Sequence, residues 1–196
     1  MESGASGRGL YAVVLAAGES RRFGSPKQLA TIDGQTLVRR AMQTAWSVAG
    51  ERVLLVAGHE WRDVSRASGP GAGFLLVNDA YREGLGTSIA CAARALAHCA
   101  DAILLLLADQ PAVAPGDLGR LLTHWTGDAR EIVAARYADT LGPPVLFPSA
   151  CFAELARLRG DRGARDLFAD ERFRVIPVDC PAAAADVDTP ADLEKF

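Results

Sequence analysis

The feature that most constrains the fold of this chain is a set of short apolar runs that no polar residue interrupts. They lie at residues 11–17, 53–57, 74–77 and 103–108. A strand with one solvated face alternates apolar and polar side chains, whereas continuous apolarity indicates that both faces are covered. The runs therefore predict the strands of a parallel sheet that lies between two layers of helices.

Helical patterns separate these runs. Residues 36–49 carry apolar side chains at three- and four-residue steps, and residues 88–99 repeat that spacing. Alternating strands and helices are typical of doubly wound α/β domains with right-handed crossovers. We therefore expect a Rossmann-like three-layer domain with a mostly parallel central sheet.

The last third of the chain departs from this alternation. Helices are predicted at residues 115–122, 149–159 and 164–169, strands at 132–137, 144–147 and 173–178, and a turn or loop at 138–143. Strands spaced this closely indicate a small antiparallel excursion from the parallel core.

The chain shows no internal repeat and no low-complexity linker, so we expect a single domain at residues 11–196. Residues 1–10 are small and polar, and we expect a flexible tail there. A cleft is expected between the parallel half of the domain and its later half.

The charge balance argues against two classes of partner. A formal net charge of −3 gives no general attraction to nucleic acid or to an anionic membrane. The longest apolar run, at residues 102–108, is far shorter than the ~20 residues that span a bilayer. No secretory signal is visible. We therefore expect a soluble, cytoplasmic protein that binds neither nucleic acid nor membrane.

The loop after the first predicted strand gathers positive charge. Gly18 lets the backbone turn and approach a ligand closely, and Arg21, Arg22 and Lys27 add three cations against the single acid Glu19. In open α/β sheets, ligands bind beyond the carboxyl ends of the strands, which is where this loop lies. The spacing matches neither the dinucleotide fingerprint nor the Walker loop. The loop predicts a phosphate site of another class, the alternative being an ordinary strand–helix connection with solvated arginines.

Two acidic positions are candidate ligands for Mg²⁺. Asp109 follows a buried strand directly, and a second acidic segment holds Asp186 and Asp188. Magnesium prefers oxygen donors, usually one or two carboxylates together with substrate phosphates and water. Both positions also suit helix capping, since Asp109 precedes the predicted helix at 115–122 and Asp188 precedes Thr189 and Pro190.

A third candidate segment runs from Asn78 to Ser88. It contains Gly84, and it leads into a predicted helix for which Thr87 and Ser88 are natural caps. The start of a helix offers free N–H groups and a positive dipole end to an anion or a polar base. A plain capped loop is the alternative interpretation of the same residues.

These segments together resemble a known family. The loop sequence LAAGESRRFGSPKQL resembles the opening signature of the molybdenum-cofactor nucleotidyltransferases, which have the nucleotide-diphospho-sugar transferase fold. The segments LADQP and DVDTPADL resemble its two metal-binding motifs, and the segment from Asn78 to Ser88 resembles its base-binding motif. The motifs occur in family order from residue 13 almost to the C-terminus.

The resemblance implies specific roles. The nucleotide would contact Leu15, Ala16, Ala17, Gly18, Arg22, Lys27, Asn78, Gly84 and Ser88, and Mg²⁺ would bind Asp109 and Asp188, with Asp186 as the alternative second ligand. Arg22, Lys27 and Asp109 would be the catalytic residues. Pro144, Asp161 and Arg165 would face the acceptor. Residues 11–110 would then form the nucleotide side of the domain and residues 111–196 the acceptor side.

The resemblance also implies an activity, the transfer of CMP from CTP to the terminal phosphate of molybdopterin. The PKQL segment is typical of the cytidylyltransferase branch, and Ala17 and Pro26 stand where the guanylyltransferase branch has glycine and aspartate. Pro143 stands where members often carry a polar residue, which leaves the acceptor open. The alternatives are GTP as donor, a sugar or polyol phosphate as acceptor, or a non-catalytic accessory protein. A molybdoenzyme or its chaperone would be a further partner.

Overall fold

The computed structural model describes residues 9–70, 73–161 and 163–196. Most of the predicted tail, residues 1–8, lies outside the described residues. The end of that tail was predicted wrongly, because Gly9 and Leu10 already belong to the first strand, β1 (Gly9–Ala16). Their partners are Ala100 and Ala102 of β6, so the backbone at these positions is held by the sheet.

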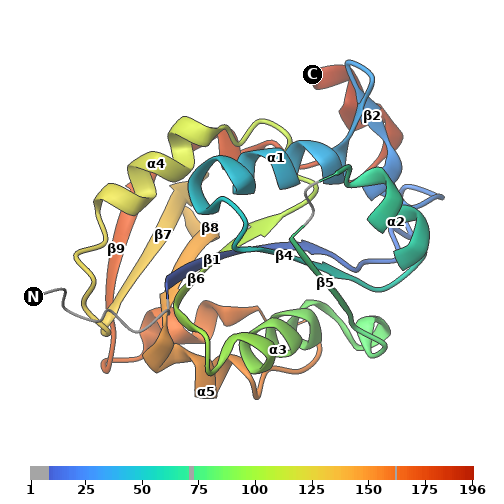
Figure 1. Cartoon of the computed structure of the whole chain (residues 1–196). Helices are drawn as coiled ribbons and strands as arrows, with labels where there is room; N and C mark the ends of the chain where they lie inside the picture. The colour runs from blue at the N-terminus through green and yellow to red at the C-terminus, as the bar shows by residue number, and fades with distance from the viewer. Residues whose placement is uncertain (1–8, 71–72, 162) are drawn as a thin grey trace, which may run out of the picture.

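A seven-stranded sheet forms the centre of the molecule (Figure 1). Its strand order is β5-β4-β1-β6-β8-β7-β9. The four strands predicted from apolar runs, β1, β4 (Val53–Ala57), β5 (Phe74–Val77) and β6 (Ala100–Leu107), lie side by side and pair in parallel. The predicted α/β fold with a mostly parallel sheet is confirmed.

The antiparallel excursion is a single strand. β8 (Thr140–Pro148) runs antiparallel to both β6 and β7 (Glu131–Tyr137), and β9 (Arg174–Asp179) then pairs in parallel with β7. The turn or loop predicted at 138–143 is a two-residue turn that ends earlier than predicted, because Ala138 and Asp139 both adopt positive φ and close a tight hairpin. A separate two-stranded sheet joins β2 (Thr31–Ile32) to β3 (Gln35–Thr36).

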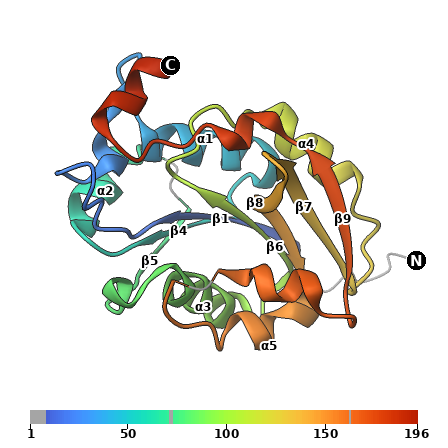
Figure 2. The same cartoon turned by 180° about the vertical axis from the view of Figure 1, so that it is seen from behind.

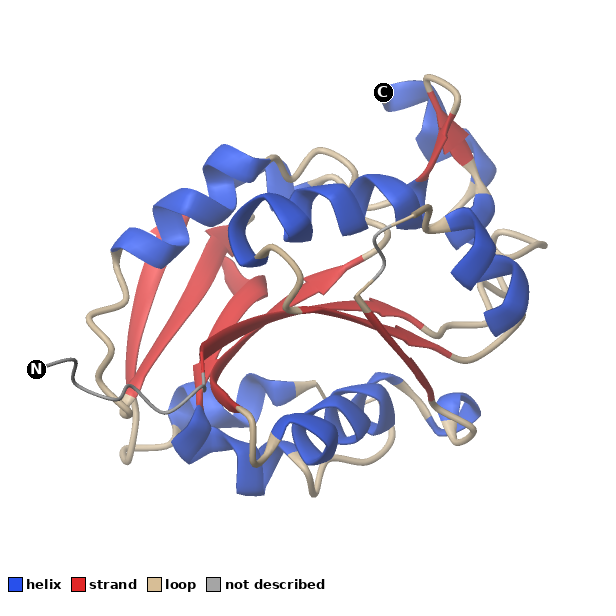
Figure 3. Cartoon of the chain, viewed as in Figure 1, coloured by secondary structure: helices blue, strands red, loops and turns tan. Residues whose placement is uncertain are grey.

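Helices cover both faces of the sheet (Figure 3). On one face, α1 (Leu37–Ala49), α2 (Trp61–Ala67) and α4 (Pro115–Thr123) bury apolar residues such as Val38, Val64 and Leu118. On the other face, α3 (Leu85–Leu96) and α5 (Phe152–Leu155) form a second core (Figure 2). The three-layer prediction is therefore correct.

Two helical segments were predicted in the last third of the chain after α4. The one at 164–169 is confirmed as a 3-10 helix with the same bounds. The one at 149–159 is a 3-10 turn followed by the short α5, and it ends early, at Leu155. Helix α2 and the strands β2 and β3 were not predicted, because short elements carry too few residues for a periodic pattern. The remaining 3-10 segments are Lys27–Leu29, Tyr81–Glu83, Pro181–Ala184 and Pro190–Lys195.

This topology brings three strand ends to one edge of the sheet. β1, β6 and β7 run in the same direction, so Ala17, Asp109 and Tyr137 lie at or just beyond the same carboxyl edge. The chain after β9 returns along this edge, where Val187 N–H donates to the carbonyl of Asp109 over 2.9 Å. Within the described residues, no helix is both long enough and apolar enough to span a membrane.

Candidate active site

A cavity of about 530 Å³ opens at this edge of the sheet. Its walls are the end of β1 and the loop that follows, the 3-10 turn before α3, the end of β6, and the C-terminal segment at Asp188. The predicted nucleotide residues that line it are Leu15, Ala16, Ala17, Gly18, Arg22, Lys27, Gly84 and Ser88. Residues far apart in the sequence therefore meet around one space.

The loop after β1 is closed by its own polar side chains. Gln28 is almost fully buried and donates from Nε2 to the carbonyl of Gly18 over 2.9 Å. The hydroxyl of Ser20 accepts from the Lys27 N–H over 3.0 Å. Gly24 takes a φ of 80°, which glycine adopts without strain and which turns the chain back before Lys27. These contacts direct the Lys27 side chain into the cavity.

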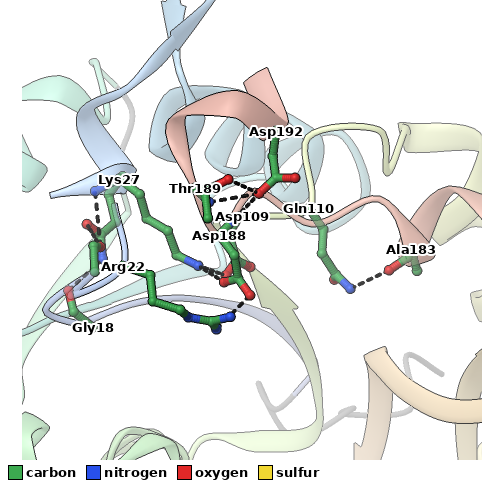
Figure 4. Close-up of polar contacts among 11 residues, drawn as sticks. Gly18, Arg22, Lys27, Asp109, Gln110, Ala183, Asp188, Thr189 and Asp192 are labelled. Carbon is green, nitrogen blue, oxygen red and sulfur yellow. Dashed lines mark hydrogen bonds and ion pairs between the residues drawn. The ribbon is translucent and has the colours of Figure 1, made fainter. Parts of the chain in front are cut away.

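Lys27 lies between the two predicted metal ligands (Figure 4). Its Nζ is 2.6 Å from Asp109 Oδ2 and 2.9 Å from Asp188 Oδ1. The guanidinium of Arg22 is 2.7 Å from the other oxygen of Asp188. Four predicted site residues, from three separate segments of the chain, therefore form one ion-pair cluster at the cavity.

The charges of this cluster support one another. Burial by itself would lower the pKa of Lys27, but the neighbouring Asp109 and Asp188 carboxylates outweigh it and raise that pKa above its ordinary value. The hydrogen bond from Lys27 is the main reason that the pKa of Asp188 is lowered. Lys27 is therefore a cation and Asp188 an anion near neutral pH.

The donor set fits a hard divalent cation. Asp109 Oδ1 is buried and has no hydrogen-bond partner among the described residues. An unpartnered buried carboxylate oxygen is costly unless a ligand satisfies it. The described residues contain no cluster of three or more His, Cys, Asp or Glu side chains that would hold a metal by themselves. A two-carboxylate site completed by substrate phosphates is the arrangement that magnesium prefers.

Asp186 and Asp188 lie on different sides of the returning chain. Asp188 lines the first cavity and contacts Lys27. Asp186 instead lines a second cavity. Asp188 is also followed by a capped 3-10 turn, in which Asp192 accepts from the N–H groups of Asp188 and Thr189. The capping predicted for this segment is therefore present beside the ion pair.

The segment before α3 differs from its prediction in two respects, the capping of α3 and the role of Asn78. α3 begins at Leu85, so Thr87 and Ser88 lie in its first turn and do not cap it. Their hydroxyls instead accept from the side-chain amide of Asn78, over 2.9 Å and 3.0 Å. Asn78 is buried and does not line the cavity. It thus holds Ser88 in place at the cavity wall.

The second cavity has a volume of about 820 Å³ and shares Leu85, Leu107 and Asp161 with the first. The predicted acceptor residues Asp161 and Arg165 both line it. Pro144 is buried in β8, and its neighbour Pro143 lines the cavity instead. The register of β8 against β7 slips at this point, so the two prolines form a bulge beside the cavity.

Sequence patterns missed several residues that line the two cavities. Glu19 forms ion pairs with Arg21 and Arg82, so that it joins the loop after β1 to the turn before α3. Gln110 and Tyr137 line the second cavity. Gln110 follows Asp109 directly, which was the available signal for it, whereas Tyr137 looks like any residue at a strand end.

Comparisons with known proteins place these features in context. A family model described as MobA-like NTP transferase domain matches residues 12–186. The chain is 30% identical to the purine catabolism protein PucB of Bacillus subtilis (strain 168), with 94% of each chain covered. It is 33% identical to nicotine blue oxidoreductase of Paenarthrobacter nicotinovorans, again with 94% of each chain covered.

Solved structures agree with this result. The crystal structure of Rv0371c from Mycobacterium tuberculosis H37Rv matches with a TM-score of 0.81 and 33% identity, covering 97% of this chain and 98% of that one. A second structure of Rv0371c, in complex with manganese, matches with a TM-score of 0.76 and 32% identity, covering 95% and 96%. A homologue of this chain therefore binds a divalent metal ion.

Proposed function

The chain belongs to the MobA-like NTP transferase family and is a nucleotidyltransferase of that family, and we propose that it transfers CMP from CTP to the terminal phosphate of a molybdopterin-type acceptor. Pyrophosphate is the second product. In this proposal the first cavity binds the nucleotide, the second binds the acceptor, and Mg²⁺ is the metal.

The observation that carries the proposal is the cluster of Lys27, Asp109 and Asp188 at the first cavity. Two carboxylates held close together repel one another, and here a buried lysine offsets that repulsion. An incoming triphosphate offers Lys27 a different anion. When Lys27 turns to the phosphates, both carboxylates become available to a divalent cation.

The proposed reaction requires no covalent bond between the substrate and the protein. An oxygen of the acceptor phosphate attacks the α-phosphorus of the nucleotide, and the bond from that phosphorus to the bridging oxygen breaks, so that pyrophosphate leaves with the electron pair. A phosphate monoester is largely ionised near pH 7, so no general base is required. Positioning and charge neutralisation then supply most of the rate.

The residues of the chain have separate tasks in this scheme. Arg22 and Lys27 hold the triphosphate. The guanidinium of Arg22 offers a fork of N–H donors, and the ammonium of Lys27 acts as a compact positive charge. Asp109 and Asp188 would hold the metal, which supplies further neutralisation of phosphate charge when bound. Asp161 lies at the junction of the two cavities, beside the place where acceptor and nucleotide meet.

CTP is preferred over GTP in this proposal because of two positions in the loop after β1. Ala17 is buried at the cavity wall, where a glycine would leave more room for the base. Pro26 precedes Lys27, at the position where the guanylyltransferase branch has an aspartate. The same loop geometry serves a nucleotidyl transfer with either donor, so the donor requires a direct test.

The test is a donor and acceptor panel. The purified protein is incubated with Mg²⁺, molybdenum-loaded pterin and each of CTP, GTP, ATP and UTP, and pyrophosphate release is followed. Release with CTP alone supports the full proposal. Release with GTP alone would overturn the donor, and release only with a sugar or polyol phosphate would overturn the acceptor.

Absence of release with every donor and acceptor would overturn nucleotidyl transfer itself. Tight binding of the finished pterin dinucleotide would then favour an accessory protein that carries the cofactor. The test includes one further assay, because the name of one relative, nicotine blue oxidoreductase, describes a redox activity. Oxidation or reduction of nicotine blue, without pyrophosphate release, would identify that class instead.

A further inference from the structure

Gln110 has an unusual environment at the second cavity. Gln110 is only 6% exposed, although it lines the cavity wall. Its Nε2 donates to the carbonyl of Ala183 over 2.8 Å (Figure 4). Its Oε1 is buried and has no hydrogen-bond partner among the described residues.

The orientation of this amide is fixed. Exchanging its oxygen and nitrogen would set Oε1 against the carbonyl oxygen of Ala183, and two acceptors repel one another. The carbonyl end of Gln110 therefore remains an acceptor in need of a donor, and a buried acceptor without one is costly. Gln110 lines the second cavity, so a ligand bound there can supply that donor.

Tyr137 lies beside this amide and is fixed as well. Its hydroxyl packs so closely against Gly142 of the neighbouring strand that a Cβ at that position would collide with it. Burial raises the pKa of Tyr137, and the neighbouring Gln110 amide and the charge of Arg165 oppose that rise. The phenol is therefore a neutral hydrogen-bonding group held at the cavity wall.

The remaining lining divides into two kinds. One wall is apolar and includes Phe147 and Phe168, whose rings stack with an interplanar angle of 5°. The opposite end carries Gln110, Tyr137, Arg165 and Asp186. A flat apolar wall facing mixed donors and acceptors suits a planar heterocycle that is polar along one edge.

Resting on the function proposed above, we propose that Gln110 and Tyr137 are the specificity-determining pair for the acceptor, and that they select a planar nitrogen heterocycle whose N–H group donates to Gln110 Oε1. The ring lies against the phenylalanine wall, and its phosphate extends past Asp161 toward the first cavity. Gln110 directly follows Asp109, so the ring and the metal ligand are positioned by adjacent residues of one strand end.

The test compares two phosphate probes that differ in the ring. Hydroxymethylpterin monophosphate carries the heterocycle, and glycerol phosphate lacks it. Calorimetry with the full chain and Mg²⁺ measures the affinity for each. We expect wild type to bind the pterin probe at least about tenfold more tightly, since a hydrogen-bonding site rejects a ligand that leaves its polar groups unpaired.

The main variant is Gln110→Met, which keeps the length of the side chain and removes both polar atoms. We expect it to lose about tenfold in affinity for the pterin probe and to leave the affinity for glycerol phosphate unchanged. Tyr137→Phe is the second variant, and it removes only the hydroxyl. It keeps the test decisive if Gln110→Met fails to fold, which a thermal melt reveals.

Gln28 supplies the matched control. It is also a buried glutamine whose Nε2 donates to a backbone carbonyl, but it lies at the first cavity, and its Oε1 accepts from Ser20 over 3.4 Å. Gln28→Met is expected to alter nucleotide affinity while the ratio between the two phosphate probes stays that of wild type.

Two results would overturn the inference. One is equal affinity of the wild-type protein for both probes. The other is a folded Gln110→Met or Tyr137→Phe variant that discriminates as wild type does. These outcomes are separate from failure of the proposed function, because the probe affinities need no turnover. Pyrophosphate release without ring discrimination would retain the transferase and remove the role of Gln110.

Discussion

The two cavities of this protein are built on opposite principles. The first is lined by charged groups that neutralise one another, with Lys27 shared by Asp109 and Asp188, and Glu19 held by two arginines. The second has a stacked aromatic wall and a buried amide oxygen that no described residue satisfies. They meet at Leu85, Leu107 and Asp161.

The difference teaches how each cavity selects its ligand. In the first, binding exchanges internal ion pairs for pairs with a ligand, so that charge and geometry matter more than shape. In the second, apolar area supplies affinity and a few fixed polar groups supply specificity. We therefore expect substitutions in the first cavity to act mainly on turnover and those in the second to act on acceptor affinity.

The largest effect is expected for Asp109→Ala. It removes one of the two carboxylates at the candidate metal site. Metal-assisted stabilisation of charge in the transition state contributes several kcal/mol, so its loss should lower kcat at least about 100-fold. Steady-state pyrophosphate release measures this, and a thermal melt checks the fold. Asp179→Ala is the control, because Asp179 also pairs with an arginine but lies outside both cavities. Unchanged turnover in Asp109→Ala would remove the metal assignment.

Gly84→Ala tests whether the two cavities are independent. Gly84 has a φ of 110°, and a Cβ there would collide with the backbone of Gly160 and with Asp161. We expect a loss of about 2–3 kcal/mol in stability, because only glycine adopts this conformation without strain, and a rise in KM for both substrates. Denaturant unfolding and steady-state kinetics measure the two effects.

Gly119→Ala is the matched control for that substitution. Gly119 lies inside α4, and a Cβ there meets nothing within 4 Å. Alanine is the better helix former, so this variant should gain about 0.5–1 kcal/mol in stability with KM values unchanged. If Gly84→Ala changed only the KM for the nucleotide, the proposed junction at Asp161 would be wrong.

A smaller effect is expected for Arg165→Met in the second cavity. This change keeps an apolar stem along the wall and removes a cation near Tyr137. Loss of one charge-assisted contact should raise the KM for the acceptor about tenfold, while kcat and the KM for the nucleotide stay within twofold, roughly, of wild type. A larger effect on the nucleotide KM than on the acceptor KM would reverse the assignment of the two cavities.

The same contrast explains what the sequence could predict. The first cavity is made of short motifs at strand ends, and each motif places several polar residues together. Local patterns therefore identified the segments that hold Arg22, Lys27, Asp109 and Asp188, and the family resemblance selected Arg22 and Asp188 within them. The parallel core was equally readable, because its apolar runs fall directly on β4 and β5 and overlap β1 and β6.

The second cavity was predicted only in part, through Asp161 and Arg165. Its lining comes from separate strands, turns and the returning C-terminal segment. Tyr137 and Phe168 belong to no motif, and Gln110 lies in the LADQP motif without a role of its own assigned to it. Their proximity depends on the register of β8 against β7 and on the tight hairpin at Ala138. The close spacing of the strands indicates an antiparallel excursion but does not fix that register. The structure was needed to bring these residues together.

The smallest effect is expected at Glu131, a buried carboxylate that lies outside both cavities and can be compared with Asp109. Glu131 is fully buried at the start of β7, at the end of the sheet opposite Asp109. Unlike Asp109, it is fully engaged: it accepts from the N–H and hydroxyl of Thr126 over 2.9 Å and 2.8 Å and pairs with Arg174. Its role should therefore be structural, and Glu131→Gln should lower Tm at pH 7 by about 2–6 °C without changing kcat.

The pH dependence of that loss identifies its cause. The pKa of Glu131 is held below the ordinary value of 4.5, mainly by the hydrogen bond from the Thr126 N–H and then by the Thr126 hydroxyl and Arg174. A carboxylate with a lowered pKa stabilises the fold above its unfolded-state pKa, and this contribution is lost as the pH falls through the folded-state value. The gap in Tm between wild type and Glu131→Gln should therefore be full at neutral pH and close in acid. A gap that stayed constant down to about pH 3 would assign the effect to packing, because charge would then contribute nothing to it.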